Sequence, residues 1–96
     1  MTQDFRQGSI TAPSDVLTQE LPDDETIFLN LATEEYFGLD SVGTAMYRAL
    51  VECGTFEAAR QRLQLEFDVD PTRLRRDLRQ LMTTLIERGL LEHRAA

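Results

Sequence analysis

The side chains that could carry out chemistry in this chain are few and lie far apart. His93 is the single histidine, and Cys53, the single cysteine, falls on an apolar helical stripe beside Gly54. The acidic clusters Asp23–Glu25 and Glu34–Glu35 have no neighbouring base. A catalytic triad needs a histidine beside a nucleophile, and a zinc site needs several closely spaced ligands. We therefore expect no catalytic residue, no metal site and no cofactor, and we predict that the chain is not an enzyme.

Arginines on the last predicted helix offer a different kind of chemistry, which is the binding of a peptide. Arg75 and Arg79 lie on one flank of a leucine stripe, together with Met82 and Ile86. We expect Met82 and Ile86 to be exposed, so that the strip is basic at one end and apolar further along. Such a strip suits an extended peptide with acidic and apolar side chains. The simpler alternative is a solvated face whose arginines pair with acids such as Asp77.

The same arginines suggest a second hypothesis, DNA binding, because a helix-turn-helix protein places its second helix in the major groove. Against this, the formal net charge is −7, nine acids and two arginines precede residue 49, and no basic wing follows Gly89. An acidic first half opposes contact with a phosphate backbone. We keep a winged-helix DNA-binding regulator as the alternative and expect neither nucleic acid nor membrane as a partner. A lone cysteine fits a reducing cytoplasm, where we place the protein.

Short elements must position these residues. Alternating apolar side chains and turn signals predict an antiparallel sheet of three strands, Val16–Leu21, Thr26–Leu31 and Tyr36–Leu39. A helical period follows, with Asp40 or Ser41, Thr55 and Asp70 as caps. The three predicted helices run to about residues 52, 67 and 88. Their expected core stripes are Val42, Ala45, Met46, Ala49, Leu50 and Cys53, then Phe56, Ala59, Leu63 and Phe67, then Leu74, Leu78, Leu81 and Leu85.

One small sheet followed by three helices is an α+β layout, and the last two helices resemble those of winged-helix proteins. We predict a flexible N-terminal arm over residues 1–14, which attaches near Ile10, and a domain over residues 15–92. Leu90 and Leu91 are expected to fold back on the core.

The strand at Tyr36–Leu39 ends a hairpin and runs directly into a helix. Nothing later in the chain offers it a strong strand partner, so we expect an open sheet edge. An extended peptide can add to such an edge through main-chain hydrogen bonds. Gly38 within this strand indicates either the close approach of another backbone or a simple bend into the helix.

These residues resemble a known family. Asp15–Leu17, Thr26–Leu31, the run Tyr36–Gly43 and Leu85–Leu91 together look like the PqqD-like family, the recognition elements for ribosomally made, post-translationally modified peptides. The resemblance implies a winged-helix-like domain that binds a precursor's leader segment as a strand added to the third strand, in a groove walled by the third helix. It implies the peptide-binding residues Glu34, Glu35, Tyr36, Phe37, Gly38, Leu39, Arg75, Leu78, Arg79, Met82 and Ile86.

Within this family, the wording of Tyr36–Gly43 is most similar to stand-alone proteins of lasso-peptide clusters. The implied partners are the precursor leader peptide, a transglutaminase-like leader peptidase and a cyclase. The pyrroloquinoline-quinone chaperone branch is the alternative, and Asp40–Gly43 departs from its helix entry. A third hypothesis is a structural subunit that binds folded enzymes and ignores leaders.

Overall fold

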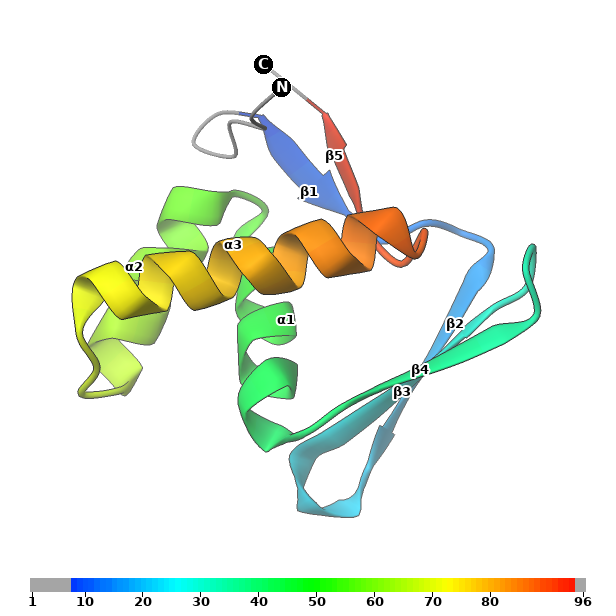
Figure 1. Ribbon diagram of the computed structural model, residues 1–96, viewed down its shortest axis with the longest axis horizontal. Helices are drawn as coiled ribbons and strands as arrows, with labels where there is room; N and C mark the ends of the chain where they lie inside the picture. The colour runs from blue at the N-terminus through cyan, green and yellow to red at the C-terminus, as the bar shows by residue number, and fades with distance from the viewer. Residues whose placement is uncertain (1–7, 95–96) are drawn as a thin grey trace.

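The computed structural model describes residues 8–94, and its elements begin and end with two short strands that lie side by side (Figure 1). A short 3₁₀ helix at Pro22–Asp24 links the second and third strands. The element order is β1 (Ser9–Thr11), β2 (Val16–Leu21), β3 (Glu25–Asn30), β4 (Glu35–Leu39), α1 (Ser41–Cys53), α2 (Phe56–Glu66), α3 (Pro71–Glu87) and β5 (Glu92–Arg94). The predicted α+β fold, a three-stranded antiparallel sheet followed by three helices, is confirmed, and a second sheet of two strands is added to it.

The inner face of the main sheet carries the aromatic part of the core. β2, β3 and β4 pair antiparallel in that order. Phe28 is 0% exposed and meets Tyr47 of α1 edge-on at 4.9 Å between ring centroids. Asn30 is buried with Phe28, whereas Ile27 and Leu31 point outward and are exposed. The alternation read from the sequence is therefore correct, and the structure shows which face is covered.

Buried polar groups between the sheet and α1 have partners. The hydroxyls of Thr26 and Thr44 lie 2.9 Å apart and share a hydrogen bond. Burial raises the pKa of Tyr47, and a hydrogen bond with Thr18 acts in the opposite direction. A buried hydroxyl without a partner would destabilise the fold, so these contacts hold α1 against the strands that lead into β4.

The junction between β4 and α1 is set by local sequence. The Asp40 carboxylate accepts a hydrogen bond from the Gly43 N–H at 2.8 Å, which identifies Asp40 as the cap. A Cβ at Gly43 would lie only 3.1 Å from the Leu39 side chain, so the glycine allows the first turn to pack on the end of the strand. Thr55 and Asp70 cap α2 and α3 in the same way.

Two residues expected in the helical core stripes are exposed. Val42 is 63% exposed and Phe67 is 46% exposed, so both predictions are wrong. Val42 occupies the first turn of α1, and Phe67 follows the last residue of α2, Glu66. Helix ends have neighbours on fewer sides than helix centres, and Tyr47 in the middle of α1 is buried in their place.

The two ends of the described chain meet in the small sheet. β1 pairs antiparallel with β5, and Ile10 is 3% exposed and donates its N–H to the Gly54 carbonyl at 2.8 Å. The part of the expected arm at Ser9–Thr11 is thus a strand, and residues 1–7 lie outside the described residues. Leu90 and Leu91 are each 1% exposed, as predicted.

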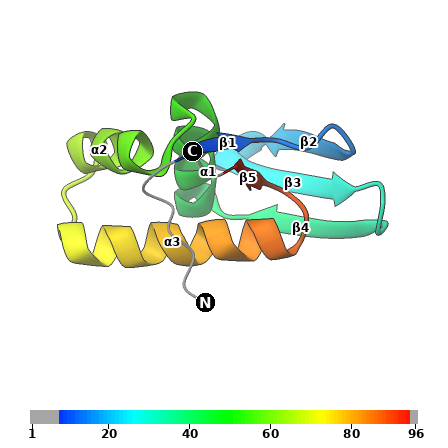
Figure 2. The same cartoon turned by 90° about the horizontal axis from the view of Figure 1, so that it is seen from above.

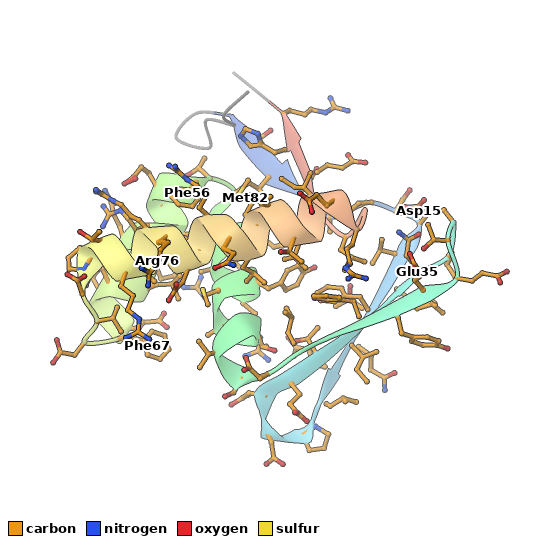
Figure 3. All side chains as sticks on the ribbon, in the orientation of Figure 1. Asp15, Glu35, Phe56, Phe67, Arg76 and Met82 are labelled. Carbon is orange, nitrogen blue, oxygen red and sulfur yellow. The ribbon has the colours of Figure 1, made fainter. Side chains whose placement is uncertain are left out.

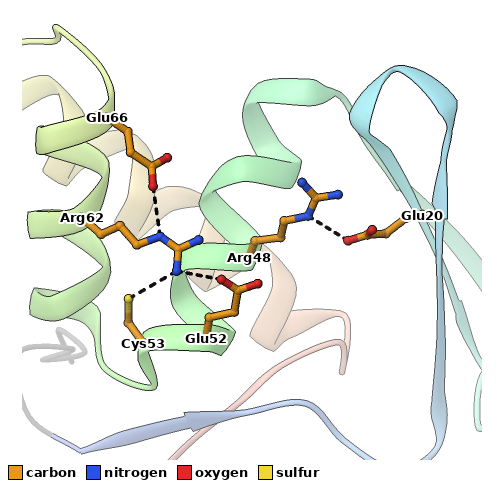
Figure 4. Close-up of polar contacts among 6 residues, drawn as sticks. All are labelled: Glu20, Arg48, Glu52, Cys53, Arg62 and Glu66. Atoms are coloured by element: carbon orange, nitrogen blue, oxygen red, sulfur yellow. Dashed lines mark hydrogen bonds and ion pairs between the residues drawn. The ribbon is translucent and has the colours of Figure 1, made fainter.

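Arginines of the first two helices are held in ion pairs (Figure 4). Arg48 of α1 pairs with Glu20 of β2 at 2.8 Å, and this contact lowers the pKa of Glu20. Arg62 of α2 pairs with Glu52 at 2.7 Å and donates a long hydrogen bond to the Cys53 sulfur at 4.0 Å. Together these contacts connect α1 to the sheet and to α2.

Within residues 8–94, every helix is too short or too polar to cross a membrane.

Candidate functional site: the free edge of β4

β4 is an edge strand, and its outer side is free in the described part of the chain. It pairs with β3 alone, while β1 and β5 pair with each other in the separate sheet. Figure 2 shows β4 as the strand of the sheet on the same side as α3. In an antiparallel ladder, every second residue of an edge strand turns its N–H and C=O outward. These groups form a template on which another extended chain can pair.

The side chains of β4 leave this edge accessible. Phe37 and Leu39 point toward the core and are half-buried and buried, respectively, whereas Tyr36 is 71% exposed on the outer face. Gly38 is exposed, and its φ is not positive. A Cβ built at Gly38 would meet only the Thr26 carbonyl oxygen, at 3.9 Å. The fold itself therefore does not require a glycine at this position.

One flank of α3 faces β4. The Arg88 guanidinium lies 5.2 Å from the centroid of the Phe37 ring, a cation–π contact between the end of the helix and the strand. Residues spaced by three or four positions share a helix face, so Asp77 and Leu81 lie on the same flank as Arg88. Leu81 is half-buried and packs on the core.

The strip predicted from the sequence lies on the other flank. Arg75 lies 4.0 Å from Glu57 at the start of α2, and Ile86 borders a surface depression between β5 and the turn that follows β3. Arg79 is exposed and lies with Arg75. The structure therefore places Arg75 and Arg79 with α2 and the outer side of α3, and Ile86 beside the hairpin that leads into β4.

Two further residues of that strip are inaccessible. Leu78 and Met82 are both 0% exposed, so the expectation that Met82 is exposed is wrong (Figure 3). The reason is that the core, which includes Ile10 and Leu90, extends along this side of α3. A peptide on the surface cannot reach either side chain in this structure.

An apolar hollow of about 500 Å³ lies between the first turns of α1, the connection from α2 to α3 and the start of α3. Val42, Phe67 and Val69 expose apolar surface around it, at 63%, 46% and 40%. The residues that line it are Val42, Ala45, Met46, Leu63, Phe67, Asp68, Val69, Asp70, Arg73, Leu74 and Asp77. Sequence reasoning missed this site because it placed Val42 and Phe67 in the core, and the one available signal was their position at the ends of their stripes.

The border of the hollow carries a few charged side chains. The hollow carries three acids and one arginine at its border, and Arg73 and Asp77 lie 3.7 Å apart. Among residues 8–94, no group of three or more histidine, cysteine, aspartate or glutamate side chains is placed to hold a metal ion. The site offers backbone groups, an apolar hollow and a few charges.

Asn30 connects the hairpin to α3 and was not singled out from the sequence. Its amide oxygen accepts hydrogen bonds from the N–H groups of Ala32 and Thr33, at 3.0 and 3.3 Å. Its amide nitrogen donates to the Arg88 carbonyl at 3.0 Å. A Cβ at Gly89, which has a φ of 72°, would lie 2.9 Å from that nitrogen. The contact of Asn30 with Arg88 and Gly89 therefore fixes the end of α3 beside β4.

Comparison with known proteins places this architecture in a family. The family model described as "Coenzyme PQQ synthesis protein D (PqqD)" matches residues 25–91, which include β3, β4 and all three helices. The chain belongs to the PqqD family. The resemblance to the PqqD-like family that the sequence indicated is thus confirmed.

Two solved structures are similar to this PqqD-family domain. The structure described as "TbiB1 in Complex with the TbiA(beta) Leader Peptide" is 34% identical, with a TM-score of 0.79 and coverage of 90% of this chain and 99% of that chain. The structure described as "Lasso peptide synthetase B1 complexed with the leader peptide" is 20% identical, with a TM-score of 0.76 and coverage of 88% and 98%, and shows the shared fold. No curated protein sequence gives a significant match.

Proposed function

We propose that this PqqD-family domain binds the leader segment of a ribosomally made precursor peptide by adding it as a strand to β4. The observation that carries the proposal is the free edge of β4, in a chain 34% identical to a protein solved with a leader peptide. Strand addition takes its affinity from main-chain hydrogen bonds and its specificity from alternate side chains. The backbone of Glu35–Gly38 supplies those bonds here.

The surroundings of β4 define what the added strand meets. Its side chains alternate, so that one set points toward the flank of α3 that carries Leu81 and Arg88 and the other set points toward the outer face beside Tyr36. Past Leu39 the peptide reaches the apolar hollow, which starts at Val42. A leader with one apolar side chain in the hollow would bury surface that is exposed in the free domain.

The role that follows is that of a non-catalytic adaptor. The domain holds the precursor, and a transglutaminase-like leader peptidase and a cyclase act on it. The description of one similar structure as a lasso peptide synthetase component supports a lasso-peptide precursor, and the family description leaves a quinone-cofactor precursor as the alternative. Leaders from the two kinds of cluster, titrated side by side, separate these assignments.

The proposal is tested by fluorescence anisotropy with a labelled leader and two variants at Gly38. Gly38→Pro removes an N–H and adds a ring at the strand edge, so we expect affinity to fall by at least about tenfold. Gly38→Ala should stay within about threefold, because the added Cβ has room in the fold. Equal behaviour of the two variants would show that the peptide does not dock as an added strand.

The alternative function suggested by the arginines of α3 is DNA binding by a winged-helix domain. Residues 8–47 contain eight acids and no basic residue, and Arg48, Arg60 and Arg62 are in ion pairs. Phosphate contacts weaken steeply with salt. A gel shift with DNA from the gene cluster that disappears between low and high salt would favour the rival, and the absence of any shift would favour the peptide.

A further inference from the structure

The outer face of the main sheet carries large apolar side chains that the core does not use. Leu17 of β2, Leu29 of β3 and Tyr36 of β4 are direct cross-strand neighbours, and Ile27 lies in the next row. Leu17 is 55% exposed and Tyr36 is 71% exposed. Antiparallel sheets that cover one face only are normally polar on the other. This row is therefore an exception that folding does not explain.

The same face is shaped as a shallow depression of about 410 Å³. Its border is formed by Leu17, Thr18, Gln19, Ile27, Leu29 and Tyr36. The opposite face is already filled, since Phe28 is 0% exposed and packs on Tyr47. A second layer of protein can pack on the outer row without displacing anything from the core.

Charge determines which kind of partner fits. Residues 8–47 contain eight acids and no basic residue. Asp15, whose carbonyl accepts the N–H of the outward-facing Leu31, lies at the hairpin end of the sheet, as labelled in Figure 3. Glu25 lies at the opposite end, paired with Leu21 across the strands. A second copy of this chain would place acids against acids, whereas a surface with Arg or Lys around an apolar centre is complementary.

The face also continues into the proposed peptide site. A strand added to β4 would direct every second side chain to the outer face, next to Tyr36. A protein that packs on this face would therefore contact the domain and the bound leader together.

We infer that the outer face of β2–β4 is the docking surface for the enzyme that processes the bound leader, a folded protein that presents an apolar patch bordered by basic side chains. The inference rests on the proposed function, because the leader is what brings the two proteins to a common substrate. Leu17 is the residue that best tests it, since β2 lies two strands away from the free edge.

The experiment uses the full chain, saturating leader and the purified leader peptidase of the same gene cluster, with association measured by biolayer interferometry. Leu17→Lys should weaken association by at least about tenfold, because it places a cation where the partner is apolar and basic. Leu65→Lys is the matched control, because Leu65 on α2 is 89% exposed and far along the chain from the sheet. It should change association by less than about twofold.

A charge variant provides a second measurement. Glu25→Lys should weaken association several-fold at low salt, and the difference from wild type should shrink at high salt, where exposed charges are screened. Glu87→Lys, on the exposed side of α3, should have no such effect. A peptidase that binds wild type and Leu17→Lys equally, or does not bind wild type, would overturn the inference.

Sedimentation velocity tests whether a second copy of this chain occupies the outer face instead. Wild-type protein that forms dimers, with Leu17→Lys monomeric, would assign the face to a second copy and would also overturn the inference. Thermal melts establish that each variant is folded. Leader affinity, measured separately by anisotropy, reports on the proposed function alone, so the two ways of failing are distinguished.

Discussion

Asn30 shows how one side chain can hold a binding edge in place. It ends β3, orders the hairpin turn through two accepted hydrogen bonds, and donates one to the last carbonyl beside α3. It is only 6% exposed, so its amide has little water to replace these partners. The relative position of β4 and Arg88 depends on this residue.

Variants at Asn30 distinguish the hydrogen bonds that its amide oxygen accepts from the one that its amide nitrogen donates. Asn30→Ala removes three part-buried hydrogen bonds and should lower the free energy of unfolding by about 1–3 kcal/mol in urea titrations. Asn30→Asp keeps the acceptor for the turn but cannot donate to the Arg88 carbonyl. We expect Asp to keep the hairpin and to weaken leader binding relative to wild type. If Asn30→Asp matched wild type in both measurements, the contact to α3 would have no role in the site.

At this scale, the sequence was informative where the determinants are local. A cap at Asp40 or Ser41 and the fold-back of Leu90 and Leu91 followed from residue types and spacing, and the structure selects Asp40 as the cap. The exposure of Val42 did not, because it depends on where neighbouring helices end. Local patterns specify a cap, and tertiary packing decides which stripe residues are covered.

α3 illustrates what an element's pattern can and cannot predict. Its start at Pro71 after the Asp70 cap was predicted, and its leucine stripe is buried in large part. The pattern defines two flanks beside the stripe but does not say which one faces the strand. The structure shows that the flank with Arg88 faces β4, because the Arg88 guanidinium lies over the Phe37 ring.

The two flanks of α3 make different predictions for charge reversal. Arg88→Glu should weaken leader binding by about tenfold, or about 1.4 kcal/mol, because it removes the cation beside Phe37 and places an acid at the edge. Arg79→Glu should change affinity by less than about twofold, since helical spacing puts Arg79 on the flank opposite to Leu81 and Arg88. Anisotropy titrations measure both. The reverse result would show that the strip predicted from the sequence is the contact surface.

The apolar hollow beside the first turn of α1 leads to a prediction about Val42. Val42→Glu should leave the free energy of unfolding within about 0.5 kcal/mol, because Val42 is 63% exposed. It should weaken leader binding by about tenfold, because an apolar leader side chain would meet a carboxylate. Leu65→Glu on α2 is the control with the same change in chemistry, and its affinity should equal that of wild type. Equal affinities for all three proteins would place the leader outside the hollow.

The two ends of the described chain, residues 8–94, pair with each other in the small sheet. We expected an arm over residues 1–14, yet Ser9–Thr11 pairs with Glu92–Arg94. Strands of three residues carry almost no periodic signal, and their partner lies at the other end of the chain. Pairings of this kind depend on tertiary contacts, which is why Ile10 was the only local indication of attachment.

Separation of this small sheet from the proposed site leads to a prediction about stability. Ile10 is 3% exposed, belongs to the core and is bonded to Gly54 at the end of α1. Ile10→Ala should lower the free energy of unfolding by about 2–4 kcal/mol, through lost burial and a cavity. Leu65→Ala, which removes the same kind of side chain from the surface, should change it by less than about 0.5 kcal/mol.

Leader binding distinguishes a structural role for this sheet from a role in recognition. β1 and β5 lie across α3 from β4 (Figure 1), so folded Ile10→Ala protein should bind the leader with wild-type affinity at low temperature. Binding should disappear only as the domain unfolds, at the lower midpoint that its melt defines. A variant that is fully folded but has lost affinity would show that the small sheet contacts the leader or sets the position of α3, and the site would then extend beyond the free edge of β4.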